Sequence, residues 1–235
     1  KSGKARSGTL TLKHGTVQTP AFMTVGTYGS VKSLTNQDLL ECNAEIILCN
    51  AYHLMIRPER SLIEKAGGLH KFMNWSRPIL TDSGGYQVFS LSSQTKVSKD
   101  GVEFKSPLNG NKLFMSPEKS IETQLYLGSD IMMIFDECTP YPASKIEAEK
   151  SMELSLYWAE MSHKANNSKM PLFGIIQGGM YPDLREISLN ELIKYDFEGY
   201  ALGGLSVGEP DHLRKEVIED IGYKLPDDKP RYLMG

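Results

Sequence analysis

The sequence predicts an α/β protein built as a (β/α)8 TIM barrel, with seven of the eight strands in this chain. Short apolar runs alternate with helical patterns, and polar residues and glycines gather where the apolar runs end. In a barrel, the carboxyl ends of the strands carry the ligand site, so these polar groups are expected to line one site. A doubly wound sheet is the alternative, but Val25–Gly29 matches its glycine-rich fingerprint only loosely.

The N-terminal part predicts a hairpin followed by the first three barrel strands. Residues 9–29 begin with alternating apolar and polar positions around His14 and Gly15, as in a β-hairpin. Thr35 and Asp38 have the spacing that opens a helix. The expected strands are residues 20–25, 45–52 and 77–81, and the expected helices are 35–42 and 58–66, the second closed by Gly67 and Gly68.

The C-terminal part continues the alternation and adds an inserted hairpin, residues 102–114, that turns at Asn109 and Gly110. Ser144 and Glu147 form a capping box for a helix that reaches His163. The further expected strands are 131–135, 172–176, 200–202 and 231–234, and the further helices are 117–128, 184–194 and 212–221. Residues 1–235 are therefore expected to form a single, incomplete barrel domain.

Composition bounds the class of protein. The chain has 235 residues, is 40% hydrophobic and 23% charged, and carries a net charge of −3, as a cytoplasmic globular protein would. No apolar run approaches the roughly 20 residues of a membrane span, and no apolar segment follows Lys1–Arg6 as in a signal peptide, so no membrane partner is expected. Without a basic excess, RNA binding would need a local patch.

The cysteines and histidines do not have metal-ligand spacing, so no metal site is expected in this chain. Three cysteines fit no zinc motif, and the five histidines lie apart, which argues against a purine deaminase. These residues are Cys42, Cys49, Cys138, His14, His53, His70, His163 and His212.

Two carboxylates at strand ends are the candidate functional groups. Asp82 leaves the strand 77–81 in ILTDSGGYQVFSL, where an α/β enzyme presents a catalytic acid. Asp136 follows five apolar residues, and a carboxylate in such a place needs a partner. The N1–H and 2-amino edge of guanine would satisfy both of its oxygens. A helix cap or an ion pair is the structural alternative for Asp136.

Other strand ends could complete a guanine site. Gln177 and the backbone of Gly203 and Gly204 could donate to the O6 of the base, and Tyr86 and Met234 offer surfaces for stacking. The glycines could instead form ordinary tight turns, or residues 203–208 could cradle a phosphate.

Five ordered segments carry a family resemblance over essentially the whole chain: TDSGGYQVFSL, MMIFDECTPYP, FGIIQGG, GGLSVGE and RYLMG. They resemble the tRNA-guanine transglycosylases, the queuine tRNA-ribosyltransferase family, of bacterial type. The resemblance implies a transferase of queuosine biosynthesis. Such an enzyme exchanges guanine at the wobble position of tRNAs with GUN anticodons for 7-aminomethyl-7-deazaguanine (preQ1), through a covalent glycosyl-enzyme. It also implies a homodimer and a small zinc subdomain on the barrel.

The resemblance also implies roles for individual residues. Asp82 resembles the general acid/base, Asp136 and Gln177 the residues that read the base edges, and the Gly204 N–H the donor to the base carbonyl. The Leu205 carbonyl resembles the acceptor for the amine of the 7-substituent. Cys138 and Val207 resemble a tight pocket that favours preQ1 over queuine. The resemblance also implies that Ser83, Gly84, Gly85 and Tyr86 line the same pocket, with Tyr86 stacking on the base.

Two parts of the family pattern are expected beyond Gly235: the Asp nucleophile that follows the RYLMG strand, and the Cys/His zinc ligands. The chain is therefore expected to bind the base but to be inactive alone, and to hold no zinc itself. The alternative is a non-catalytic, RNA-binding partner subunit of a transglycosylase heterodimer. The presence of both Asp82 and Asp136 argues against that alternative.

Overall fold

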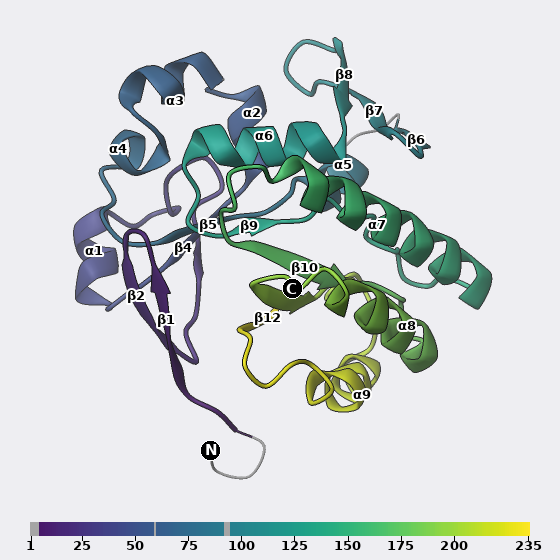
Figure 1. The fold of residues 1–235 in the computed structure, drawn as a ribbon. Helices are drawn as coiled ribbons and strands as arrows, with labels where there is room; N and C mark the ends of the chain where they lie inside the picture. Colours follow the sequence, from purple (N-terminus) through teal and green to yellow (C-terminus); the bar gives the residue numbers. More distant parts are fainter. Residues whose placement is uncertain (1–4, 59, 92–94) are drawn as a thin grey trace. The chain divides into compact units, whose positions relative to one another are not determined.

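Figure 1 shows the computed structural model, which describes residues 5–58, 60–91 and 95–235. The chain forms two compact units. The first unit comprises Lys1–Gly84 and Lys119–Met132, and the second comprises Gly85–Glu118 and Met133–Gly235. Two parts of the sequence predictions lie outside the described residues: the first four residues of the segment Lys1–Arg6, and Glu59 of the predicted helix 58–66. The single domain over residues 1–235 stays a prediction.

The first unit contains the predicted hairpin and a parallel sheet. Strands β1 (Gly8–Leu12) and β2 (Gly15–Thr19) pair antiparallel around the turn that contains His14, and they form the purple ribbon of Figure 1. Leu80 also bridges Ile131 in parallel. The parallel sheet has the order β3 (Thr24–Val25), β4 (Ile47–Cys49), β5 (Ile79–Thr81).

The helices of the first unit follow its strands. Thr35 caps α1 in the predicted capping box with Asp38, because its side chain accepts from Asp38 N and the Asp38 carboxylate accepts from Thr35 N. The helices are α1 (Asn36–Glu41), α2 (Ala51–Ile56), α3 (Arg60–Ala66), α4 (Leu69–Met73) and most of α6 (Pro117–Leu127). Side chains from β4, β5 and these helices form one buried cluster, which includes Leu39, Ile47, Ile63, Leu69, Ile79 and Leu127.

The predicted strand 45–52 is wrong beyond Cys49. The chain turns at Asn50 into α2, whose Ala51, Tyr52 and Leu54 are buried. Both the strand and the buried face of the short helix are apolar, so the apolar run did not reveal the change. The strand predicted at 20–25 is likewise reduced to β3, and the separate helix α4 was not predicted.

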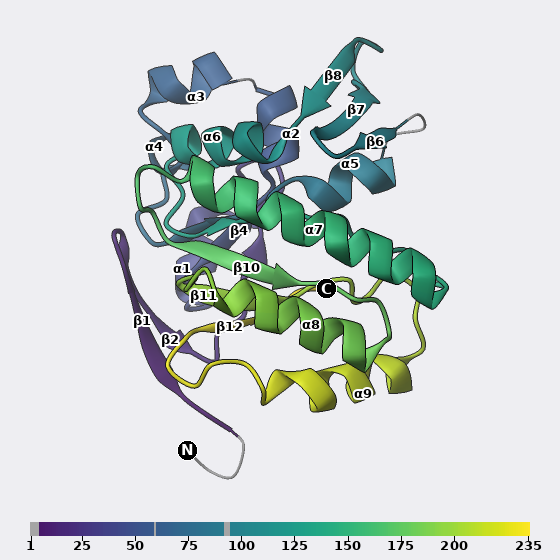
Figure 2. The ribbon, with the colours of Figure 1, turned by 45° about the vertical axis from the view of Figure 1, so that its right-hand side comes forward.

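The second unit contains a parallel sheet with long helices. The sheet has the order β12 (Arg231–Leu233), β11 (Gly199–Leu202), β10 (Leu172–Ile176), β9 (Met132–Met133), and β9 lies at the boundary between the units. Figure 2 shows α7 (Lys145–Ala165), α8 (Pro182–Ile193) and α9 (Asp211–Gly222) side by side, in agreement with their packing contacts. The capping box of Ser144 and Glu147 starts α7 as predicted.

The insertion in the second unit has one strand more than the predicted hairpin. Strands β6 (Lys96–Ser98), β7 (Gly101–Lys105) and β8 (Lys112–Met115) form an antiparallel sheet that follows α5 (Gly85–Leu91). The turn at Asn109 and Gly110 is confirmed: Asn111 N donates to Asn109 Oδ1, and Gly110 has a φ of 72°.

The α/β class and the alternation of strands and helices are confirmed. In the described part of the chain, seven strands belong to two parallel sheets, β3–β4–β5 and β9–β10–β11–β12, each in chain order. Because the strands form separate sheets, closure into a (β/α)8 barrel stays a prediction. Among the described helices, none is both long and apolar enough to cross a membrane.

Candidate functional site

Asp82 follows β5 in the first unit, and its carboxylate is held by the start of α2. Ala51 N donates to Asp82 Oδ1 at 2.9 Å, and Asn50 Nδ2 donates to Asp82 Oδ2. Asn50 occupies the N-cap of α2 without capping it by its side chain, so this amide is used to hold Asp82 instead. The Asp82 backbone N–H donates to the Cys49 carbonyl at 3.1 Å. Asp82 was predicted from the sequence, whereas Asn50 was not.

Ser83 and Gly84 connect Asp82 to α5. Ser83 is buried, and its carbonyl accepts from Ser120 Oγ at 2.6 Å. Gly84 has a φ of +83°, and a Cβ at this position would come within 3.0 Å of the Tyr52 Cβ. The glycine is therefore required both by its backbone conformation and by close packing.

Gly85 and Tyr86 begin α5 in the second unit. Gly85 is buried, whereas the Tyr86 side chain is 50% exposed. A half-exposed aromatic ring has a free face that a flat ligand could cover.

Asp136 and Gln177 form a buried pair in the second unit. Gln177 directly follows β10, and its Nε2 donates to Asp136 Oδ2 at 2.7 Å. Asp136 is 6% exposed and Gln177 is fully buried. The backbone N–H of Gln177 donates to Ser188 Oγ of α8, which fixes the base of its side chain. The two residues predicted to read a base are thus neighbours.

One oxygen of this pair is unsatisfied. Within the described part of the chain, Gln177 Oε1 is buried and has no hydrogen-bond partner. Buried polar atoms nearly always have one, so an orphaned acceptor next to a carboxylate is a place where a ligand donor would be stabilised.

Gly203 and Gly204 follow β11 and pack against the Gln177 amide. A Cβ on Gly203 would lie 2.5 Å from Ile175 Cγ2 and 2.8 Å from Gln177 Nε2. A Cβ on Gly204, which has a φ of +62°, would lie 2.5 Å from Gln177 Oε1. Glycine is required here because the backbone approaches Gln177 closely, and a tight turn alone would not require it at Gly203.

The loop after Gly204 is closed by Glu209. The carboxylate of this buried residue accepts from Ser206 N at 2.7 Å and from Val207 N at 2.8 Å. Burial acts to raise the pKa of Glu209, but these backbone hydrogen bonds bring it below its ordinary value. Because the N–H groups of Ser206 and Val207 already donate to a carboxylate, they are not available to a phosphate, which argues against residues 203–208 as a phosphate cradle. Glu209 was not predicted as a site residue from the sequence.

Leu205 and Met234 also lie in the second unit. Leu205 is buried, and Met234 is half-buried with its N–H donating to the Leu202 carbonyl at 3.2 Å. A Cβ on Gly235 would lie 3.1 Å from the Leu205 carbonyl oxygen, so the end of the chain lies beside that carbonyl.

Arg185 of α8 was also missed. Its guanidinium is fully buried and donates to the carbonyls of Ile176, Gly179 and Gly203. In the sequence it is one polar residue in a helical pattern, and no motif distinguishes it.

The structure corrects the view that the histidines are scattered. His14 and His70, both in the first unit, stack with their ring centroids 3.6 Å apart, and Asp130 lies beside both. His14 Nδ1 is 2.8 Å from Asp130 Oδ1, and His70 Nε2 is 3.0 Å from Asp130 Oδ2. Two imidazoles and a carboxylate are donors that zinc accepts, so this cluster could hold a metal ion.

The Asp130 carboxylate already has backbone partners. It accepts from His14 N at 3.1 Å and from Ile79 N at 2.9 Å. Burial acts to raise the pKa of Asp130, but hydrogen bonds from His70, Ile79 and His14 bring it below its ordinary value. The cluster ties the turn of the hairpin to the first residue of β5, whereas Asp82 follows the last residue of that strand.

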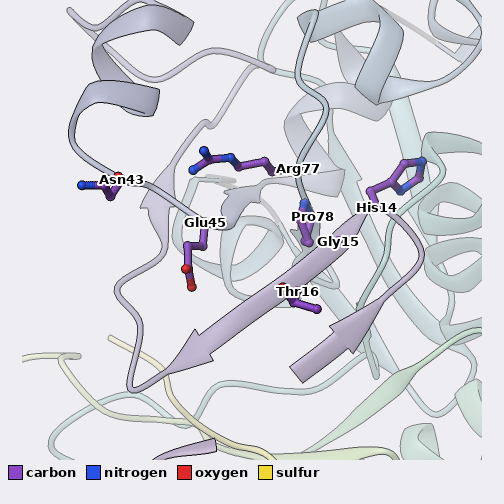
Figure 3. Close-up of a pocket in the computed structure, with 7 residues that line it drawn as sticks. All are labelled: His14, Gly15, Thr16, Asn43, Glu45, Arg77 and Pro78. Atoms are coloured by element: carbon purple, nitrogen blue, oxygen red, sulfur yellow. The ribbon is translucent and has the colours of Figure 1, made fainter. Parts of the chain in front are cut away.

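A pocket of about 290 Å³ lies beside this hairpin turn (Figure 3). Figure 3 shows the His14 ring turned away from the charged residues Glu45 and Arg77. Glu45 accepts from Gln18 N, and Arg77 donates to the Ala44 carbonyl, so both already have backbone partners. Glu45 and Arg77 precede β4 and β5, at the opposite strand ends from Asn50 and Asp82.

The fold and these residues define an α/β protein with polar groups fixed at the carboxyl ends of parallel strands, where such proteins bind ligands. The sequence pattern of the family described as queuine tRNA-ribosyltransferase matches residues 1–235. The chain belongs to the queuine tRNA-ribosyltransferase family, a family of transferases.

Individual relatives agree. The chain is 56% identical over 239 residues to a queuine tRNA-ribosyltransferase of Acinetobacter baylyi. This match covers all of the chain and 62% of the relative. It is 56% identical to that of Acinetobacter baumannii strain ATCC 17978 and 55% identical to that of Idiomarina loihiensis, again over the whole chain and 63% of each relative. The chain thus spans a little under two thirds of these relatives.

Proposed function

We propose that this protein exchanges guanine at the wobble position of tRNAs with GUN anticodons for 7-aminomethyl-7-deazaguanine. The observation that carries the proposal is the buried pair of Asp136 and Gln177 beside Gly204, in a member of the queuine tRNA-ribosyltransferase family. The names of the relatives state a tRNA substrate, which this proposal extends to the present chain.

The pair supplies what a guanine-type base needs. The Asp136 carboxylate would accept from N1–H and from the 2-amino group, two parallel donors that match its two oxygens. The Gln177 amide and the Gly204 N–H would donate to O6. The Leu205 carbonyl would accept from the amine of the 7-substituent, and Tyr86 and Met234 would stack on the ring.

Cys138 supports the choice of base. Burial, and then the charge of Asp136, raise the pKa of the Cys138 thiol to about 12, so this side chain is neutral at neutral pH. A neutral, partly buried thiol takes up space without competing for the base donors. Together with Val207 it would keep the pocket small around the 7-position, which favours the aminomethyl group over the bulkier substituent of queuine.

The chemistry would divide between two carboxylates. In a covalent glycosyl transfer, a carboxylate oxygen bonds to C1′ of the nucleotide while the bond from C1′ to N9 breaks and guanine leaves. Asp82, oriented by Asn50 and Ala51 N, would take the proton from the ring nitrogen of the incoming base as that nitrogen bonds to C1′ and the bond from C1′ to the nucleophile carboxylate breaks. The family resemblance implies an Asp nucleophile after the RYLMG strand, which residues 1–235 do not include, so we propose that these residues bind the base without exchanging it.

Zinc and the partners are proposals as well. The donors of this chain do not fit the Cys/His zinc cluster that the resemblance implies. Cys42 is exposed, Cys49 is buried with a raised thiol pKa, and Cys138 belongs to the other unit. The zinc ligands are therefore proposed to lie outside this chain. A homodimer in the cytoplasm is proposed on the resemblance alone.

Isothermal titration of the chain with preQ1 and with guanine tests the proposal. Binding in the micromolar range is expected, and an Asp136→Asn variant should lose it because the amide donates where the carboxylate accepted. Asp220→Asn, the same change at an exposed position of α9, is the control and should bind as the unsubstituted chain does. Failure of the folded chain to bind either base would refute base recognition at Asp136.

Exchange is tested separately with tRNA and radiolabelled guanine. The chain should bind base without incorporating label into tRNA. Steady incorporation would show that the chain contains its own nucleophile.

A further inference from the structure

The guanidinium of Arg185 is fully buried and contacts the backbone around the residues proposed to read the base. Arg185 donates from Nε to the Gly179 carbonyl at 2.7 Å, from Nη1 to the Ile176 carbonyl at 3.2 Å and from Nη2 to the Gly203 carbonyl at 2.9 Å. Ile176 ends β10, and Gly203 follows the end of β11. One guanidinium therefore ties the ends of two neighbouring strands to the first turns of α8.

The buried charge is costly for a purely structural link. Arg185 is fully buried, and burial lowers its pKa to about 10, with Cys138 and Glu209 acting in the opposite direction. The side chain thus stays charged at neutral pH, although its three hydrogen bonds go to neutral carbonyls. Burying a charge disfavours folding more than burying a neutral donor would, which indicates that the charge has a use.

The carbonyl at Gly203 and the N–H of Gly204 belong to the same peptide group. In a planar trans peptide the C=O and N–H point in opposite directions, so fixing the oxygen also fixes the direction of the N–H. A cation on the oxygen polarises the amide and makes its N–H a stronger donor.

A second carbonyl bound by Arg185, that of Ile176, fixes the backbone of Gln177 in the same way. The Ile176 carbonyl shares its peptide with the Gln177 N–H, which donates to Ser188 Oγ at 3.2 Å. The same carbonyl accepts from Gly203 N at 3.1 Å. Arg185 therefore fixes the backbone of Gln177 and of Gly204 together, and these are the two proposed donors to the base O6.

We propose that Arg185 is a positioning residue for carbonyl recognition: it orients and strengthens the Gly204 N–H, and holds Gln177 in register with it, without touching the base. This inference rests on the proposed function, because it assumes a guanine-type base at Asp136 and Gln177. The two proposed donors to the base O6, the Gln177 amide and the Gly204 N–H, are both neutral. Arg185 would add a positive charge behind them.

Paired ligands separate positioning from general stability. Guanine and 6-thioguanine share the N1–H and 2-amino donors, but sulfur is a weaker acceptor than O6. Affinities of both are measured by titration for the unsubstituted chain, for Arg185→Gln and for Arg185→Lys. Arg185→Gln should lower the affinity for guanine about 10-fold and the affinity for 6-thioguanine less than about twofold, as expected when one hydrogen bond is weakened. Arg185→Lys, which keeps the charge, should recover part of the loss.

The control is Leu189→Ala, which truncates another buried residue of α8 and should leave the ratio of the two affinities unchanged. An unchanged ratio of the two affinities in Arg185→Gln, with guanine and 6-thioguanine weakened equally or not at all, would overturn the proposal. So would failure of both Arg185 variants to fold while Leu189→Ala folds, because Arg185 would then be structural. Failure of the unsubstituted chain to bind guanine would instead reject the proposed function, and this inference with it.

Discussion

The side-chain amide of Gln177 donates to the carboxylate of Asp136 at 2.7 Å, and both side chains are buried. The pair presents carboxylate oxygen and amide groups together, in a place from which water is largely excluded. Hydrogen bonds to a ligand are strong in such a place because few water molecules compete for them.

Gln177→Glu tests this relationship. Two carboxylates at hydrogen-bond distance cannot both ionise, so the pair would hold a proton and lose its complementarity to guanine. Guanine binding should weaken at least about 10-fold at neutral pH, equivalent to about 1.4 kcal/mol, in a titration experiment. Asn190→Asp, which makes the same amide-to-acid change at an exposed position of α8, should bind normally. Unchanged affinity in Gln177→Glu would show that the pair does not read the base.

Gly204→Ala tests the close approach to Gln177. The added Cβ would lie 2.5 Å from Gln177 Oε1, whereas a Cβ on Gly208, which also has a positive φ, would meet nothing within 4 Å. Gly208→Ala should therefore show only the backbone cost, of about 1 kcal/mol in the free energy of unfolding. Gly204→Ala should lose more stability than this and should also lose guanine binding. Equal effects of the two changes in thermal melts and titrations would contradict the steric account.

Asn50→Ala tests how Asp82 is held. The change removes the donor to Asp82 Oδ2 and leaves that buried oxygen short of a hydrogen bond. The free energy of unfolding, measured in urea, should fall by about 1–3 kcal/mol. Asn190→Ala, at an exposed position, should change it by less than about 0.5 kcal/mol. If Asn50→Ala were as mild as the control, the amide would not be holding the carboxylate.

Asp130 should make stability depend on pH. Its pKa is lower in the folded chain than in the unfolded chain, because hydrogen bonds from His70, Ile79 and His14 outweigh burial. The contribution is therefore complete above the ordinary Asp pKa, about 3.9, and is lost as the pH falls through the lower folded value. Asp130→Asn should be less stable than the unsubstituted chain at pH 7, and the difference should shrink in acid. A constant difference in urea unfolding between about pH 7 and pH 3 would contradict this linkage.

The sequence predicted those elements whose signals are local. The capping boxes at Thr35 and Ser144, the turn at Asn109 and Gly110, and the strand at Leu172–Ile176 depend on neighbouring residues, and all are confirmed. The end of β4 was misplaced because an apolar run continues into the buried face of α2. Periodicity cannot separate a buried strand from a short buried helix.

The candidate site was predicted as far as motifs reach. Asp136, Gln177 and Gly204 were proposed from strand ends and from the family resemblance, and the structure places them together in the second unit. Asn50 and Arg185 act through contacts with loops elsewhere in the chain, so no local pattern marks them. Glu209 binds N–H groups of its own loop and lies in the segment GGLSVGE, but the motif alone did not reveal this role. The association of His14 with His70 and Asp130 was hidden for the same reason, because these residues are far apart in the chain.

In the proposed function, the Asp136 carboxylate reads the donor edge of a guanine-type base. It is tested most directly by the ratio of the affinities for guanine and hypoxanthine, which differ by the 2-amino group alone, in the unsubstituted chain and in Asp136→Asn. We expect a preference for guanine of at least about 10-fold in the unsubstituted chain, because one hydrogen bond to a carboxylate is lost with hypoxanthine, and no preference in the variant. A preference that survives in Asp136→Asn would contradict it.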